Sequence, residues 1–136
     1  MKVGYVRVST VEQNLARQLE LMKTLGVEKI YCDKMSGKNT ERTEFKEMIE
    51  FLREGDTLYV ESFSRLSRST LDFLNTVSRL QAKSVNLVSD KEKMDMSTPQ
   101  GKFMVTVFAA LSELERTSML ERQREGIEIA KAEGKC

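Results

Sequence analysis

The sequence contains no histidine, and it has only one proline and two cysteines among its 136 residues. The absence of histidine excludes His-based acid/base chemistry, Ser-His-Asp and Cys-His nucleophiles, and His-ligated metal sites. Cys32 and Cys136 alone form neither a zinc site nor a disulfide framework, and such sparse cysteine is typical of a reducing compartment. No signal peptide and no apolar run of about 18 residues is present, so we expect a cytoplasmic protein without a membrane partner.

The charge of the chain is nearly balanced, because 22 Lys and Arg residues face 21 Asp and Glu residues and leave a net charge of +1. Bulk charge therefore indicates no partner, and any contact with nucleic acid has to come from a local cluster of basic side chains. Hydrophobic residues make up 40% of the sequence, which is enough for a real core. The length fits one domain, since domains usually have about 100 to 150 residues.

Apolar runs alternate with segments of helical periodicity along the first hundred residues. Residues 2–8 are mostly apolar and rich in β-branched side chains, and they are followed by leucines and a methionine at helical spacing up to Gly26. Such alternation predicts an α/β fold with a mainly parallel sheet of four to five strands, covered by helices on both faces. The expected strands are 2–8, 29–32, 57–60 and 84–89, and the expected helices are 15–25, 45–52 and 71–80.

The last third of the sequence predicts one long helix, from Thr98 to about Lys131. At a rise of about 1.5 Å per residue this helix would span roughly 50 Å, more than the core is wide. Its first half is apolar on nearly every face and its second half is highly charged, so we expect another subunit to cover part of it. A hairpin folding back on the core is the alternative, but no turn signal occurs between Lys102 and Glu125. We therefore divide the chain into a core, 1–97, and an oligomerisation helix, 98–136.

Arg7 and Ser9 lie two residues apart at the carboxyl end of the first expected strand, so their side chains should point to the same side. Open α/β sheets bind ligands at this edge, and an arginine within an apolar strand is costly without an anion. Ser9 also has capping-box spacing to Glu12, so it could simply be the N-cap of the following helix. A helix N-terminus beside an arginine is, however, also a phosphate site.

A second basic cluster follows the third expected strand, at the same edge of the sheet. Within the segment 62–69, Arg65 and Arg68 are three residues apart, which would place them side by side on one helical turn. No acidic residue neutralises them locally, and a guanidinium fork matches a phosphate bidentately. A solvated basic turn is the alternative, and Arg42 taken alone would be a surface residue.

Together these residues predict a serine ringed by up to four arginines. Without histidine, paired cysteine or metal ligands, this set suits nucleophilic attack on a phosphodiester, in which guanidinium groups stabilise the charge on the non-bridging oxygens.

In order and spacing, the motifs of this chain resemble the catalytic domain of the serine recombinases, the resolvase/invertase family. The resemblance covers essentially the whole chain, and the ordered set is far more specific than any one motif. The motifs are Tyr5-Val6-Arg7-Val8-Ser9-Thr10 with Gln13, Asp33-Lys34-Met35-Ser36-Gly37, Arg42, Gly55-Asp56, Ser64-Arg65-Leu66-Ser67-Arg68, Glu115-Arg116 and Leu120-Glu121-Arg122.

This resemblance implies that Ser9 attacks a phosphate of a double-stranded DNA recombination site, forms a 5′-phosphoserine link and frees a 3′-hydroxyl. It also implies a homodimer and a synaptic homotetramer, which exchanges strands by rotation and religates them without metal, nucleotide or other cofactor. Small-molecule substrates are not expected, and the protein would be encoded by a bacterium, phage or transposon and associated with the nucleoid. The catalytic positions that the resemblance matches are Ser9, Arg7, Arg42, Arg65 and Arg68, and the supporting positions are Tyr5, Gln13, Asp33, Ser36, Ser64, Arg116, Glu121 and Arg122.

One position departs from the pattern of the small resolvases and invertases. Many of them carry aspartate where this chain has Ser64, whereas serine at this point is familiar in the large transposon and phage integrases. The resemblance therefore leans toward the integrases and leaves the acid/base assignment open. Family members continue into a DNA-binding domain after the long helix, so we expect this chain to be a fragment that binds DNA weakly.

Two other classes of function compete with a recombinase. A non-catalytic oligomerisation module could use the long helix for assembly and its arginines only for phosphate binding. A small-molecule enzyme on a nucleotide-binding sheet is disfavoured, because no Gly-x-Gly-x-x-Gly or Walker sequence follows any expected strand.

Overall fold

The computed structural model describes residues 1–9, 15–35 and 42–132, with only the backbone of Ser9, Met35 and residues 128–132. Its centre is a five-stranded sheet in the order β2-β1-β3-β4-β5, in which β5 alone pairs in an antiparallel sense. This confirms the mainly parallel sheet that the alternating pattern predicts. The strands are β1 (Lys2–Ser9), β2 (Lys29–Met35), β3 (Thr57–Val60), β4 (Asn86–Ser89) and β5 (Met94–Asp95).

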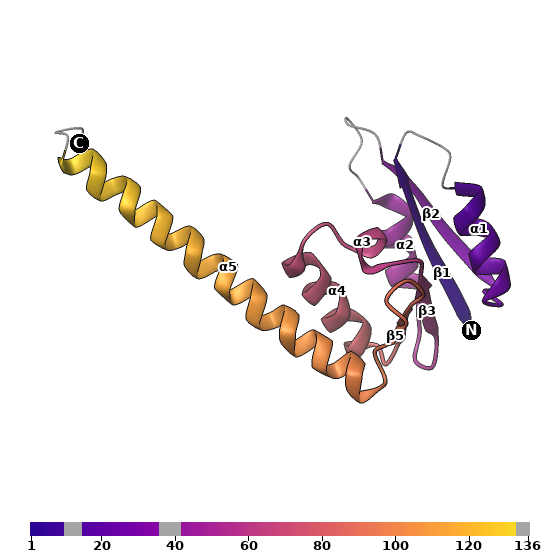
Figure 1. The fold of residues 1–136 in the computed structure, drawn as a ribbon. Helices are drawn as coiled ribbons and strands as arrows, with labels where there is room; N and C mark the ends of the chain where they lie inside the picture. Colours follow the sequence, from indigo (N-terminus) through magenta and orange to yellow (C-terminus); the bar gives the residue numbers. More distant parts are fainter. Residues whose placement is uncertain (10–14, 36–41, 133–136) are drawn as a thin grey trace.

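Helices cover both faces of the sheet, as expected (Figure 1). Alternate residues of β1 point to opposite faces. Val6 and Val8 pack under α1 with Met22, whereas Val3 and Tyr5 belong to the larger core on the other face. The helices are α1 (Leu15–Thr24), α2 (Thr43–Phe51), α3 (Phe63–Leu66), α4 (Thr70–Ala82) and α5 (Pro99–Ala132).

Two expected strands differ from the structure by two or more residues at one end, and the fifth strand has no counterpart among the expected ranges. The second strand was expected to end at Cys32, but β2 continues to Met35 because it stays paired with β1 as far as Ser9. The fourth strand begins at Asn86 rather than Ser84, since Ser84 has a φ of 58° and turns the chain after α4. The short edge strand β5 has only two residues, which is too few to give a periodic signal.

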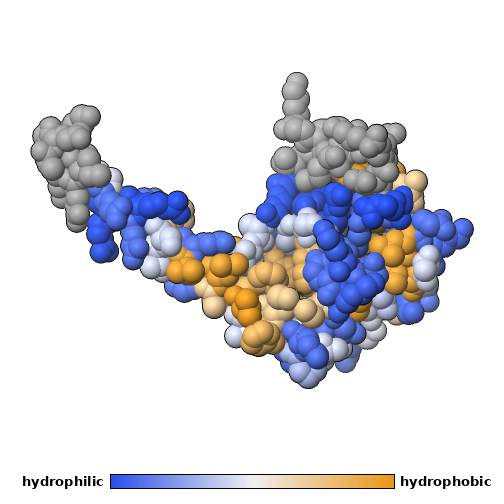
Figure 2. All heavy atoms as spheres, in the orientation of Figure 1, coloured by the Kyte–Doolittle hydropathy of each residue, from blue (hydrophilic) through white to orange (hydrophobic). Residues whose placement is uncertain are grey.

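The long C-terminal helix is confirmed, and α5 projects from the core with its far end well away from the sheet (Figure 1). Its 34 residues correspond to about 51 Å. Phe108 and Val105 pack against the core, and the Phe108 ring meets Phe73 edge-to-face at a centroid distance of 5.0 Å. On another side of α5, apolar side chains are exposed near the core and charged ones follow (Figure 2). The exposed large apolar residues that share this side are Phe103, Val107, Leu111 and Leu114, and Met119, Leu120 and Ile127 are exposed farther along the helix.

The root of α5 is held by a hydrogen-bonded turn. Asp95 Oδ1 accepts from Asn86 Nδ2 at 2.8 Å and from the backbone N–H of Ser97 at 2.9 Å. Gly101, in the first turn of α5, lies so close to the backbone of Asp95 and Met96 that a Cβ there would collide with both. Glycine at 101 therefore lets the helix start against the turn. Among the described helices, none is both long and apolar enough to cross a membrane.

We predict that Gly101→Ala destabilises the protein. The added Cβ would collide with the backbone of Asp95 and Met96, which cannot move aside as a flexible side chain can. Overpacking of this kind costs about 1–3 kcal/mol in the free energy of unfolding, measured by urea denaturation followed by circular dichroism. The matched control is Gly126→Ala in the same helix, where a Cβ meets nothing within 4 Å, and alanine there should stabilise by up to about 1 kcal/mol. Equal effects of the two substitutions would contradict the close approach at 101.

Candidate active site

The candidate site lies at the carboxyl ends of β1 and β3. The chain leaves β1 for β2 on one side and reaches β3 on the other, so the strand order reverses between these neighbours. Such a switch point is where open α/β sheets bind ligands. Arg7 of β1 bridges it, because its Nη2 donates to the backbone carbonyl of Ser64, which follows β3.

Four arginines gather at this edge. The pKa of the Arg7 guanidinium is lowered from its usual value, first by burial and then by the positive charges of Arg42, Arg68 and Arg65. Like charges brought this close disfavour one another's charged forms, and a bound anion would relieve the repulsion. The arrangement is therefore a site prepared for a negatively charged group such as a phosphate.

Arg42 is buried, contrary to its interpretation as a surface residue when taken alone. Its Nη1 lies 3.1 Å from Asp72 Oδ2, its Nη2 donates to the carbonyl of Leu66, and its Nε donates to Tyr5 Oη at 3.5 Å. The guanidinium also lies over the Phe45 ring, 3.8 Å from its centroid. These contacts fix the charge of Arg42 in one place before any ligand binds.

Asp33 and Tyr5 form the support beneath Arg42. The Tyr5 hydroxyl donates to Asp33 Oδ2 at 2.7 Å, and burial raises the pKa of this tyrosine above its usual value. The same carboxylate accepts the backbone N–H groups of Glu44 and Phe45, each at 3.0 Å, in the first turn of α2. Because Arg42 immediately precedes α2, Asp33 fixes the point from which its side chain extends.

The segment after β3 is less regular than expected. The helix α3 ends at Leu66 and Ser67 has extended backbone angles, so the prediction that Arg65 and Arg68 share a helical turn is wrong. Ser64 Oγ lies 2.8 Å from Ser62 Oγ, and the backbone N–H of Arg68 donates to Asp72 Oδ2 at 3.1 Å.

Two residues of the site were missed from the sequence. Asp72 joins Arg42 to the backbone of Arg68, and its own N–H donates to Ser69 Oγ at 3.1 Å. The signal was the Ser-x-x-Asp capping spacing at 69–72. Gln18 is fully buried under β1, with Nε2 3.4 Å from the carbonyl of Arg7. Its signal was a polar residue within the apolar stripe of a helix.

Three predicted site residues of α5 lie away from this cluster, and three others cannot be placed relative to it within the described residues. Arg116 pairs with Glu113 and Arg122 donates to the Ser118 carbonyl, both within α5, and Glu121 is exposed on the same projecting helix. Ser9 is the last residue of β1, paired with Met35, and its side chain is not described. Gln13 and Ser36 lie outside the described residues, as do the partners of the capping box proposed for Ser9.

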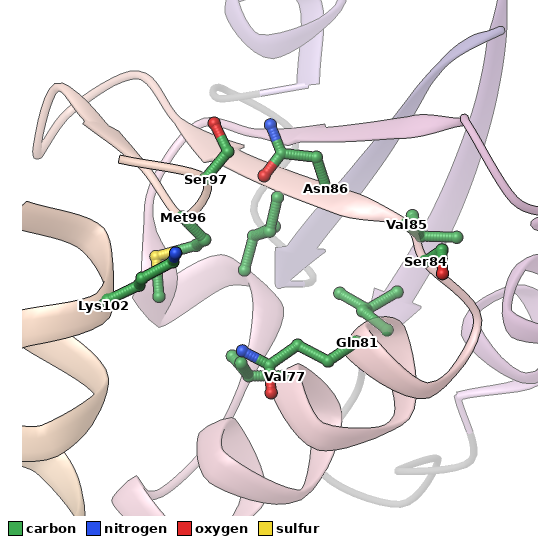
Figure 3. A pocket seen from close by; sticks show the side chains of 10 residues that line it. Val77, Gln81, Ser84, Val85, Asn86, Met96, Ser97 and Lys102 are labelled. Atoms are coloured by element: carbon green, nitrogen blue, oxygen red, sulfur yellow. The ribbon is translucent and has the colours of Figure 1, made fainter. Parts of the chain in front are cut away.

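A groove at the root of α5 lies at the other edge of the sheet (Figure 3). It touches the amino end of β4 at Val85 and Asn86, with Val77 of α4 and Met96 on its apolar side. Lys102 supplies its one ionisable side chain. Its lining therefore lacks the cluster of arginines found at the carboxyl ends of β1 and β3. Among the described residues, no three carboxylate or thiol side chains cluster in a way that could hold a metal ion.

Comparisons with known proteins agree with this geometry. The family model "Resolvase, N terminal domain" matches residues 2–136. A DNA-invertase from Enterobacteria phage P7 is 44% identical over 135 residues, which cover 99% of this chain and 73% of that protein. A resolvase from Clostridium perfringens is 43% identical over 140 residues, covering 99% of this chain and 74% of the relative.

Solved structures show the same relationship. A resolvase-family site-specific recombinase from Streptococcus pneumoniae superposes with a TM-score of 0.79 at 30% identity, covering 98% of this chain and 99% of that one. The N-terminal catalytic domain of TP901-1 integrase gives a TM-score of 0.67, also at 30% identity, over 86% of this chain and 98% of that domain. The chain thus belongs to the resolvase family of serine recombinases. It is a catalytic domain for site-specific DNA recombination.

We predict that Asp33→Ala lowers the free energy of unfolding by about 1–3 kcal/mol, because it leaves buried donors of Tyr5 and α2 without an acceptor. Tyr5→Phe is the matched variant, since it removes one hydroxyl and leaves the carboxylate bound to α2. It should cost only about 0.5–1.5 kcal/mol in the same urea titration. If Tyr5→Phe destabilises the protein more than Asp33→Ala does, the Asp33 carboxylate is not the main acceptor that holds Tyr5 and the start of α2.

Proposed function

We propose that Ser9 is the nucleophile of this recombinase and that Arg7, Arg42, Arg65 and Arg68 bind the scissile DNA phosphate. The observation that carries the proposal is the gathering of these four guanidinium groups at the end of β1, the strand whose last residue is Ser9. Arg7 also links β1 directly to the segment carrying Arg65 and Arg68, through the Ser64 carbonyl. This supports the proposal, because β1, which ends at Ser9, and β3, which precedes Arg65 and Arg68, are neighbouring parallel strands.

In the proposed reaction, Ser9 Oγ forms a bond to phosphorus while the bond to the 3′ oxygen breaks. The serine proton is released, the departing 3′ oxygen is protonated, and the products are a 5′-phosphoserine link and a 3′-hydroxyl. Negative charge grows on the non-bridging oxygens, which planar guanidinium forks bind bidentately. Because one ester replaces another, the reverse step rejoins the strands without a nucleotide or metal cofactor.

Preorganisation of the arginines follows from their contacts. Arg42 is held by Asp72, by the Leu66 carbonyl and by the Tyr5 hydroxyl, so little reorganisation is needed when charge develops. The carboxylate that many small family members carry at position 64 is absent here. We propose that Asp72 serves instead to orient an arginine, since it contacts Arg42 directly and fixes the backbone of Arg68.

The proposed partners are a DNA recombination site and further copies of the chain. The exposed apolar side of α5 supports a dimer, and the strand-exchange chemistry requires two dimers to form a tetramer at two sites. Arg116, Glu121 and Arg122 do not contact the arginine cluster within one chain, so we assign any role they have to the assembled oligomer. We also propose that the chain divides into a core, 1–97, and an oligomerisation helix, 98–136. A cytoplasmic location is part of the same proposal.

The test is covalent trapping of the DNA. Incubating the protein with labelled, nicked duplexes of a recombination site should give a protein–DNA adduct that survives denaturation by detergent. We expect no adduct from Ser9→Ala, and an adduct rate about 100- to 1000-fold lower from Arg65→Ala, because one transition-state donor is lost.

Two outcomes would overturn the catalytic proposal. An adduct that persists in Ser9→Ala excludes Ser9 as the nucleophile. Intact oligomers with no adduct in the unmodified protein would favour the non-catalytic oligomerisation module.

A second prediction concerns assembly. Phe103 on α5 is 70% exposed, so Phe103→Glu should shift a dimer toward monomer without unfolding the core. Phe108 is unsuitable for this test because its ring packs on Phe73 of the same chain. Sedimentation equilibrium at tens of micromolar protein measures the shift. Ala109→Glu, also exposed but on another side of the helix, is the control that should leave the dimer intact. A monomeric unmodified chain would contradict the prediction.

A further inference from the structure

A groove of about 480 Å³ runs between α2 and α4, next to the candidate active site. Arg42 and Arg68 belong to both, so the groove adjoins the proposed phosphate site. Its lining contains four cations and one carboxylate. The lining residues are Arg42, Phe45, Lys46, Arg68, Ser69, Asp72 and Arg79.

The single carboxylate of the groove, that of Asp72, is already hydrogen-bonded within the chain. Asp72 Oδ2 accepts from Arg42 Nη1 and from the backbone N–H of Arg68, each at 3.1 Å. Lys46 and Arg79 are both exposed, and neither forms an ion pair with any described acidic residue. The outer part of the groove therefore carries two positive charges that nothing in the described chain neutralises.

The positions of these two cations fit a strand of DNA. Arg79 lies seven residues after Asp72 on α4, which is two helical turns or about 10 Å. Lys46 lies one turn beyond Arg42, and its backbone N–H donates to the Arg42 carbonyl. Successive phosphates on one strand are about 3.4 Å apart along the duplex axis, so about three of them span the distance from Asp72 to Arg79.

We propose that this groove binds the DNA backbone beside the scissile phosphate, with Lys46 and Arg79 each contacting a flanking phosphate. The inference rests on the proposed function, because it takes the phosphate at Arg42 and Arg68 as its starting point. Neither residue belongs to the set that the family resemblance identifies. Both contacts are to the backbone, so they position the duplex and carry no sequence information.

A second copy of the chain fits the groove less well. The charged half of α5, the part that projects furthest, has four acidic and three basic residues between 113 and 127. Such a mixed surface offers little complementarity to a groove that is positive along its length, whereas a phosphate backbone is negative throughout.

The experiment is a salt titration of DNA binding. Fluorescence anisotropy of a labelled 20-bp duplex of mixed sequence, taken as about two turns, gives the binding constant of the chain at several KCl concentrations. Loss of one phosphate contact should reduce the slope of log K against log[KCl] by about 0.9. We expect this reduction for Lys46→Ala and for Arg79→Ala, a doubled reduction for the double variant, and weaker binding in each. Lys23→Ala on α1, across the sheet, is the charge-matched control and should keep the slope of the unmodified protein.

The outcomes separate the two proposals. An unchanged slope in both variants overturns the groove assignment, even where the Ser9-dependent adduct forms. Reduced slopes without any adduct would support the groove and count against the catalytic proposal. Altered sedimentation of Arg79→Ala with an unchanged slope would make the groove a protein–protein contact and would overturn the inference.

Discussion

Positive charge gathered at one sheet edge governs how the neighbouring residues are arranged, because the charges of Arg42, Arg65 and Arg68 all disfavour the charged form of Arg7. Arg42 is the most deeply held of them, and its partners come from β1, α3 and α4 at once. Asp72 supplies a carboxylate to Arg42, whereas the other groups that contact Arg7 and Arg42 within the described residues include a phenol, two aromatic rings and backbone carbonyls. A site compensated in this way keeps a net positive charge, at a cost in stability that an anionic ligand would offset.

The sheet and the long helix could be predicted because their signals are periodic over many residues. The site could be predicted only in part. Arg7 and Arg65 follow directly from their positions after strands, but the burial of Arg42 could not be foreseen, because its partners Leu66 and Asp72 are distant in sequence. The break at Ser67 was also missed, since Arg-x-x-Arg spacing says nothing about whether a helix continues past its first turn.

The first half of α5 shows a further limit of pattern reasoning. An apolar surface on nearly every side indicates that several partners cover it, but the pattern does not say which side each one takes. Phe108 and Val105 face the chain's own core, whereas Phe103 and Leu114 are left exposed. Which side of α5 is buried depends on where α4 packs against it, and therefore on the complete fold.

Because α5 is attached to the core only near its first residues, a small change of angle at that end moves its far end by a much larger distance. Its root is clamped between Asp95 and Gly101, and its far end projects clear of the globule. Over a length of about 50 Å, a tilt of about 10° at the root displaces the tip by roughly 9 Å. The same tilt moves Phe108, nine residues from the start of the helix, by only about 2 Å, so a modest repacking against Phe73 corresponds to a tip movement comparable to the width of a DNA groove. The position of any group bound near the tip of α5 therefore depends on how the few residues at its root pack against the core.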